Sequence, residues 1–135
     1  MPDTNRLLLA SGFTEMALGA AAGWPYALAV AEPERARRWG IRSPARLRQW
    51  HLDLVMLGSL SALAGVALPD LSRRVAYPLA LGAWTNANAF GVLAVRPGAR
   101  DHHAYRIGVA ASFAVTSWGF AGLAVVATRR LRQAR

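Results

Sequence analysis

The chain has 135 residues, of which 54% are hydrophobic and 17% are charged, and it combines a net charge of +9 with no cysteine. This length leaves no room for a second domain, and the absence of cysteine excludes disulfides and thiolate metal ligands. All 16 basic residues are arginine, and they gather in the connectors and the C-terminal tail, where cations meet lipid headgroups. We therefore expect a lipid bilayer as partner and no nucleic acid.

Four apolar stretches make up most of the sequence. Each supplies the roughly 20 apolar residues that a helix needs to cross a bilayer. A water-soluble bundle would carry charges along its outer faces, whereas the ionisable groups inside these stretches are Glu15, His51 and Asp53. We therefore predict an all-α, integral-membrane four-helix bundle, a multi-pass protein of the cell membrane that forms one domain over residues 1–135. Its predicted spans are 7–31, 50–69, 75–95 and 107–127.

The first stretch carries Glu15 and the small residues Gly19 and Gly23 at a spacing that favours close helix packing. Its length of about 25 residues exceeds that of a secretory signal, and we expect it to be retained. Glu15 has two readings, since it could carry a proton or serve as a protonated acid bonded to a neighbouring helix. The arginines divide almost evenly between the two ends, so the positive-inside rule does not fix the orientation.

The second stretch opens on Trp50, and His51 and Asp53 are expected in its first turn. His51 is the histidine that falls within a span, and a neutral imidazole is a common metal ligand. The alternative is an interfacial histidine solvated by headgroups. Asp53 lies two residues on and points to another side of the helix, so we expect it to stabilise the helix N-terminus instead of pairing with His51.

The third stretch contains a carboxamide stripe. Asn86 lies between Gly82 and Phe90 on one helix face, and Asn88 points in another direction. These amides could contact a substrate, or they could form interhelical hydrogen bonds worth about 1 kcal/mol. Trp84 lies near the middle of the span, where it either lines a site or fills the bundle.

These residues also resemble a known family. The run from Trp50 to Gly58 and the later Gly82-Ala83-Trp84-Thr85-Asn86 segment resemble the small four-span membrane isomerases that include hydroxylaminobenzene mutase and styrene oxide isomerase. The resemblance covers mainly residues 46–95. The matching positions are His51, Asp53, Pro69, Gly82, Trp84 and Asn86.

The resemblance implies an isomerase or mutase that rearranges a small apolar aromatic substrate, an arylhydroxylamine or an epoxide. In the styrene oxide isomerase branch, the histidine is the axial ligand of a ferric haem b held in a trimer, and the iron acts as a Lewis acid. The resemblance therefore implies that His51 is the metal ligand, that His51 and Trp84 contact haem b, and that the chain forms a homo-oligomer. Asn86, Asn88 and Glu15 are the candidate catalytic residues.

Three positions depart from the family pattern. Leu57 stands where the family has an asparagine, and in the isomerase branch Gly82 and Phe90 replace an acidic residue and a tyrosine. These departures disfavour styrene oxide itself and leave Asn88 or Glu15 as the polar partner of a different rearrangement. Two alternatives remain: a small-multidrug-type transporter that uses Glu15, and a non-enzymatic membrane subunit whose polar residues serve packing.

Overall fold

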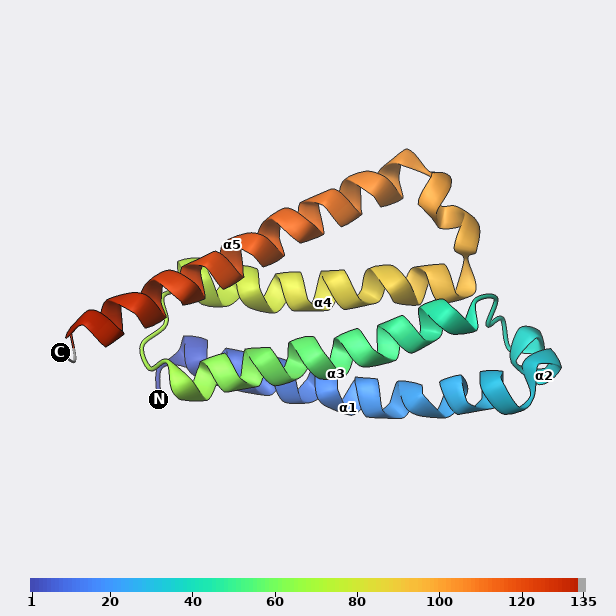
Figure 1. Ribbon diagram of the computed structural model, residues 1–135, viewed down its shortest axis with the longest axis horizontal. Coiled ribbons are helices and arrows are strands. Elements are labelled where there is room, and N and C mark those ends of the chain that lie inside the picture. Colours follow the sequence, from blue (N-terminus) through green and yellow to red (C-terminus); the bar gives the residue numbers. More distant parts are fainter. Residues whose placement is uncertain (134–135) are drawn as a thin grey trace.

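The computed structural model describes residues 1–133, and every regular element in that range is a helix (Figure 1). The prediction of an all-α protein is therefore confirmed. Two short helices form the connections at one end of the molecule, α2 (Pro33–Arg38) and the 3₁₀-helix η1 (Pro97–Asp101). The four long helices are α1 (Asp3–Ala31), α3 (Pro44–Ala67), α4 (Arg73–Val95) and α5 (His103–Gln133).

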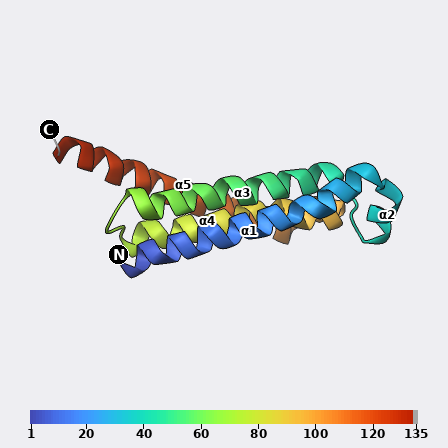
Figure 2. The same cartoon turned by 90° about the horizontal axis from the view of Figure 1, so that it is seen from below.

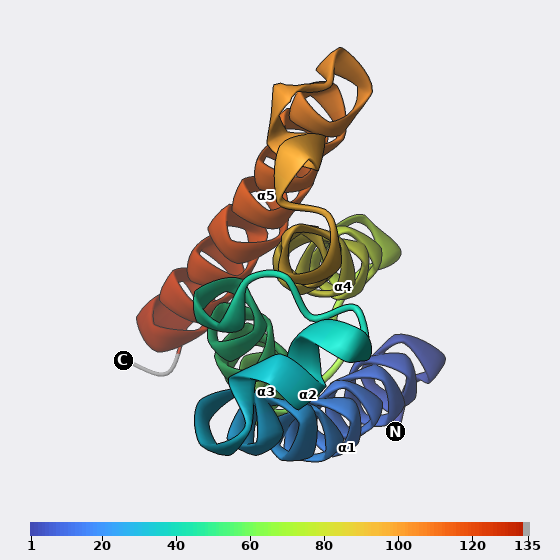
Figure 3. The same cartoon turned by 90° about the vertical axis from the view of Figure 1, so that its right-hand side faces the viewer.

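Three of the long helices form the body of the molecule. α1 and α3 run antiparallel side by side, and α4 packs against α3 and α1 (Figures 1 and 2). Seen end-on, α5 lies outside this group and crosses α4 obliquely (Figure 3). The only residues that α5 buries are Ser112 and Gly119, so most of its surface is left to the surroundings.

Glycines let α1 and α3 come into backbone contact. A Cβ atom on Gly58 would lie 2.6 Å from the Gly12 carbonyl oxygen, and one on Gly65 would lie 2.9 Å from the Asn5 carbonyl oxygen. A Cβ on Gly12 would in turn lie 2.7 Å from the Ala62 nitrogen. Any side chain at these positions would push the helices apart, so the glycines set the separation of α1 and α3.

Two buried polar residues fasten the start of α1 to the turn between α3 and α4. The Asn5 amide donates to the carbonyl oxygens of Gly65 and Leu68, both at 2.8 Å, and its Oδ1 accepts from the Leu71 nitrogen. The Thr4 hydroxyl donates to the Leu71 carbonyl oxygen at 2.6 Å. These bonds satisfy backbone groups that the end of α3 leaves unpaired.

Apolar packing continues along the whole interface of α1, α3 and α4. It divides into a group near the α3–α4 turn, a central group and a group beside α2. The central group, which lies nearest the candidate site, consists of Leu54, Leu57, Ala83 and Ala87.

Three helices are long and apolar enough to cross a membrane, namely α1, α3 and α5, and they indicate a membrane protein. The prediction of four such spans is supported only in part, because α4 does not reach the same hydropathy. Two arginines open α4, and Thr85, Asn86 and Asn88 interrupt its middle. Two of these residues, Asn86 and Asn88, are candidate site residues of the sequence analysis.

Candidate functional site

His51 lies at the interface between α3 and α1. Its half-buried imidazole faces the small residues of α1, where Nδ1 lies 2.6 Å from the carbonyl oxygen of Gly19. A carbonyl oxygen only accepts hydrogen bonds, so Nδ1 carries the proton and donates it. In the neutral imidazole with its proton on Nδ1, Nε2 carries the lone pair, which is the form in which a histidine binds a metal.

Gly23 provides space beside this imidazole. A Cβ atom at Gly23 would lie 3.4 Å from the His51 Cε1 atom and 3.7 Å from Nδ1. A larger side chain would press on the ring edge that carries the hydrogen bond. The Gly19-x-x-x-Gly23 spacing on α1 therefore does two things: Gly19 brings α3 close, and Gly23 leaves room for the imidazole.

The helix that carries His51 begins earlier than expected. α3 starts at Pro44, where the Ser43 hydroxyl accepts a bond from the Arg46 nitrogen at 3.4 Å. His51 therefore lies about two turns into the helix instead of in its first turn. The expectation that Asp53 stabilises the helix N-terminus is wrong for the same reason. Asp53 is buried and accepts a hydrogen bond from Gln49 at 3.1 Å.

A chain of polar groups links α4 to α1 inside the bundle. The Trp84 indole N–H donates to the Ser11 hydroxyl at 2.8 Å, and Ser11 lies within 3.4 Å of the Glu15 Oε1 atom as a donor. Glu15 is fully buried, and its Oε2 atom has no hydrogen-bond partner among residues 1–133. The same is true of the buried Ser61 hydroxyl. Ser11 thus connects Trp84 and Glu15 in one cluster of hydrogen-bonded side chains.

A second polar contact joins α3 and α4. The Trp50 indole N–H donates to the Asn88 Oδ1 atom at 3.2 Å, and the Asn88 amide donates to the Trp84 carbonyl oxygen at 2.8 Å. Gly91 makes this possible, because a Cβ atom there would lie 3.1 Å from the Trp50 ring. Asn88 is therefore an interhelical link whose amide retains one further N–H.

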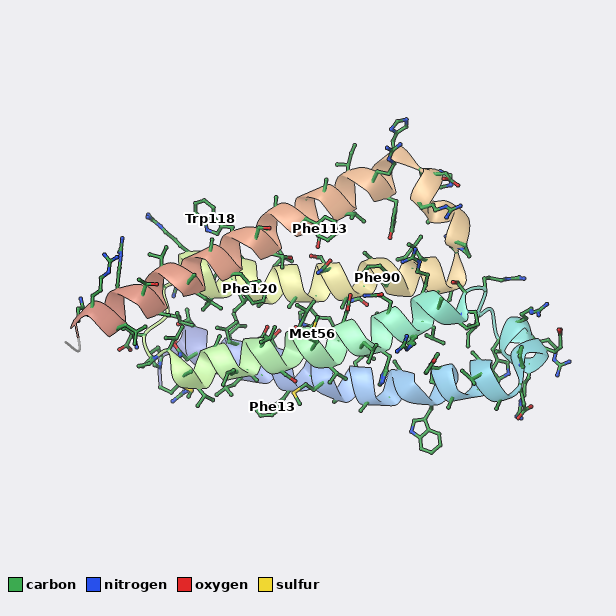
Figure 4. The ribbon with its side chains drawn as sticks, viewed as in Figure 1. Phe13, Met56, Phe90, Phe113, Trp118 and Phe120 are labelled. Atoms are coloured by element: carbon green, nitrogen blue, oxygen red, sulfur yellow. The ribbon has the colours of Figure 1, made fainter. Side chains whose placement is uncertain are left out.

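Asn86 makes no side-chain hydrogen bond to another residue within the described part of the chain. It is half-buried, and the Arg46 guanidinium lies 5.7 Å from the ring of Phe90, one turn further along α4 (Figure 4). Thr85, beside it, shares a 2.8 Å hydrogen bond with Ser112 of α5. Of the two candidate asparagines, Asn86 thus has the freer amide.

Two cavities meet at Asn88. One, of about 320 Å³, lies between α4 and α5 and is lined by Thr85, Asn88 and Tyr105 among others. The other, of about 340 Å³, lies between α3 and α4 beside Trp50. The Tyr105 hydroxyl donates to the Ala89 carbonyl oxygen at 2.9 Å and so closes part of the first cavity. Each cavity is large enough for a one-ring molecule.

The candidate residues are distributed over separate contacts. The structure joins Trp84 with Glu15 and Trp50 with Asn88, while the hydrogen bond of His51 goes to α1 instead. Within residues 1–133, no group of three or more histidine, aspartate or glutamate side chains is placed to hold a metal ion.

Sequence reasoning missed Ser11 and Tyr105. Ser11 lies four residues before Glu15, a spacing that puts both on one helix face and could have identified it. Tyr105 gives no such signal, because its partner lies on another helix. Comparison with protein-family models, with curated proteins and with solved structures finds no match for this chain.

Proposed function

We propose that this chain is a membrane isomerase or mutase that rearranges a small apolar aromatic substrate of the arylhydroxylamine or epoxide type, with His51 as the axial ligand of ferric haem b. The proposal rests on the resemblance of residues 46–95 to the small four-span membrane isomerases. The observation that carries it is the hydrogen bond from His51 Nδ1 to the Gly19 carbonyl oxygen. That bond leaves Nε2 free and holds the ring in one orientation.

The donor set of this site suits a porphyrin better than a bare metal ion. One imidazole is a sufficient protein ligand for haem iron, because the porphyrin supplies four nitrogens of its own. Ferric haem held in this way would supply a Lewis acid that stabilises negative charge on the substrate oxygen as its C–O or N–O bond breaks. His51 is only half-buried at the α1–α3 surface, so one chain would leave part of the cofactor exposed. We propose that a second copy of the chain buries the exposed part.

The residues of this chain have distinct proposed roles. Asn86 has the least constrained amide and is the proposed hydrogen-bond donor to the substrate oxygen. Asn88 is held by Trp50 and Trp84, and Glu15 is fully buried behind Ser11, so both are proposed as positioning residues. By bonding α4 to α1, the Trp84 to Glu15 chain keeps the Gly19 carbonyl in register with His51.

The membrane location has a functional reason in this proposal. We propose that α4 also crosses the bilayer, as the inner of four spans in a multi-pass cell-membrane protein. The reasons are that α1, α3 and α5 all contact it and that Trp84, Thr85 and Asn88 form hydrogen bonds to these helices. An apolar substrate would enter from the lipid. The surrounding hydrocarbon would keep water away from a cationic intermediate.

The transporter alternative depends on Glu15. A carboxylate that couples proton and cation movement must be reached by both, yet Glu15 is fully buried and bonded to Ser11. This burial favours the isomerase proposal over the transporter.

The test is the visible absorption spectrum of detergent-purified protein expressed with haem precursor. We expect a Soret band that His51→Ala abolishes and that the matched control His102→Ala, which changes an exposed histidine of a connector, retains. Gly23→Leu should shift or weaken the band by crowding the imidazole. A band of full intensity in His51→Ala would show that the axial assignment is wrong, and a colourless parent protein would contradict the proposed cofactor.

A further inference from the structure

The end of the molecule opposite α2 contains a cavity that the proposed function does not use. It has a volume of about 400 Å³ and lies between the start of α4 and the last turns of α5. Val75, Trp118, Gly122 and Val125 contribute its apolar wall, and Arg74 and Arg129 also line it. Trp118 of α5 is exposed at the surface (Figure 4), and its indole N–H donates to the Arg74 carbonyl oxygen at the start of α4, at 3.1 Å. The cavity therefore has an apolar side along the helices and a cationic side at their ends.

The charge in this cavity is unbalanced. Two arginines, Arg74 and Arg129, line it, and no acidic residue does. Like charges that share a cavity repel one another, most strongly next to a low-dielectric membrane. An anion between them would relieve that repulsion and accept their hydrogen bonds.

The arginine–carboxylate ion pairs of the described chain lie at the opposite end of the bundle. The three ion pairs found in residues 1–133 are Arg35 with Glu32, Arg37 with Glu34, and Arg100 with Asp101, and all lie in or beside α2 and η1. Arg74 and Arg129 have no such partner in the described chain. Most arginines of the described chain likewise have no carboxylate within ion-pair distance; Arg74 and Arg129 differ in that they line one cavity together with a long apolar wall.

Two further groups at the cavity suit an anion. Ser72 also lines it, and although Ser72 occupies the N-cap position of α4, its side chain makes no capping hydrogen bond. Its hydroxyl is therefore free to donate. The N-terminus of α4 adds the positive end of a 23-residue helix dipole.

We propose that this cavity binds an anionic phospholipid, with the headgroup phosphate between Arg74 and Arg129 and an acyl chain along Val75, Trp118 and Val125. The apolar wall distinguishes a lipid from a free phosphate, because a free phosphate would contact the cationic side alone. The arginines distinguish an anionic lipid from a zwitterionic one, since an uncompensated headgroup charge is what they complement.

The test is native mass spectrometry of the delipidated full chain in detergent, titrated separately with phosphatidylglycerol and phosphatidylcholine of equal chain length. We expect the first phosphatidylglycerol to bind about 10- to 30-fold more tightly than phosphatidylcholine, from roughly 1 kcal/mol for each of two arginines. The Arg74→Gln/Arg129→Gln variant should lose this preference. Both side chains lie on the surface, so the variant should fold, and the circular dichroism spectrum checks this.

The matched control is Arg42→Gln/Arg106→Gln, which removes two exposed arginines from the other end of the molecule. It should keep the full preference. The proposal is overturned if the parent binds both lipids equally, or if the two double variants lose the preference to the same extent. It is also overturned if about 10 mM inorganic phosphate, a concentration too low to screen charges in contact, displaces the lipid completely, which would identify a free phosphate site instead. The readout needs no haem, so it is independent of the proposed isomerase activity.

Discussion

The α1–α3 pair and the α4–α5 pair are both made of long apolar helices, yet they pack in different ways. Gly12 and Gly19 on α1, like Gly58 and Gly65 on α3, lie two turns apart and meet the partner helix directly. Between α4 and α5, Gly82 meets Thr116 and Gly119 meets Leu79 just as closely, but Gly108, near the start of α5, has nothing within 4 Å of its Cβ position. The difference teaches that small residues bring α1 and α3 together along their length, whereas they bring α4 and α5 together over only part of theirs.

The largest expected effect tests that difference with one substitution in each pair. Gly12→Leu places a side chain against the backbone of Gly58 and Ala62, and we expect a loss of about 3 kcal/mol or more in stability. Gly108→Leu should change stability by less than about 0.5 kcal/mol, because nothing lies within 4 Å of its Cβ position. Thermal unfolding in one detergent measures both. Equal losses would show that α5 packs as tightly as α3.

A smaller effect is expected from the polar fastening at the start of α1. Asn5→Leu leaves the Gly65, Leu68 and Leu71 backbone groups without their partner, and we expect a loss of about 2 kcal/mol. The neighbouring exposed Arg6→Leu serves as the control and should lose little. Hydrogen–deuterium exchange should speed up in residues 65–71 of the Asn5 variant alone. Unchanged exchange there would contradict the role of Asn5.

The smallest effect compares two tryptophans that both donate an indole hydrogen bond. Trp84→Phe breaks the bond to Ser11 inside the bundle and should cost about 1 kcal/mol. Trp118→Phe breaks the bond to the Arg74 carbonyl at the exposed edge of α5 and should cost less than half as much. The apparent melting temperatures of the two variants measure which substitution costs more stability. A larger loss for Trp118 would show that the α4–α5 bond stabilises the protein more than the α1–α4 bond does.

Much of the fold could be predicted from the sequence because hydropathy is a local property. The apolar stretches locate α1, α3, α4 and α5 to within a few residues at most ends. The exceptions are the end of α5, six residues after its apolar stretch, and the start of α3, six residues before its own. At the start of α3, Ser43 and Pro44 supply a cap and a first turn. Ser43 and Pro44 lie outside the apolar stretch, so hydropathy alone does not predict this start.

The candidate site was less predictable because its contacts join distant parts of the chain. Residue type and position identify His51 as a metal-ligand candidate, but the partner of its Nδ1 is a backbone atom of another helix. Trp84 and Ser11 are 73 residues apart, so no local sequence spacing predicts their hydrogen bond. Sequence reasoning could identify the polar residues inside the bundle, whereas their pairing depends on how four helices are rotated about their axes.

The hydrogen bond from His51 has a genetic consequence. Its acceptor belongs to the main chain, so no substitution can delete the Gly19 oxygen, and replacement can only displace it. A side chain at Gly19 would lie 2.7 Å from Val55 and force α3 away, and one at Gly23 would crowd the imidazole. A screen for second-site mutations that disable His51 should therefore return glycines of α1. It should not return a polar residue whose side chain accepts the hydrogen bond of His51, because the acceptor is a backbone carbonyl.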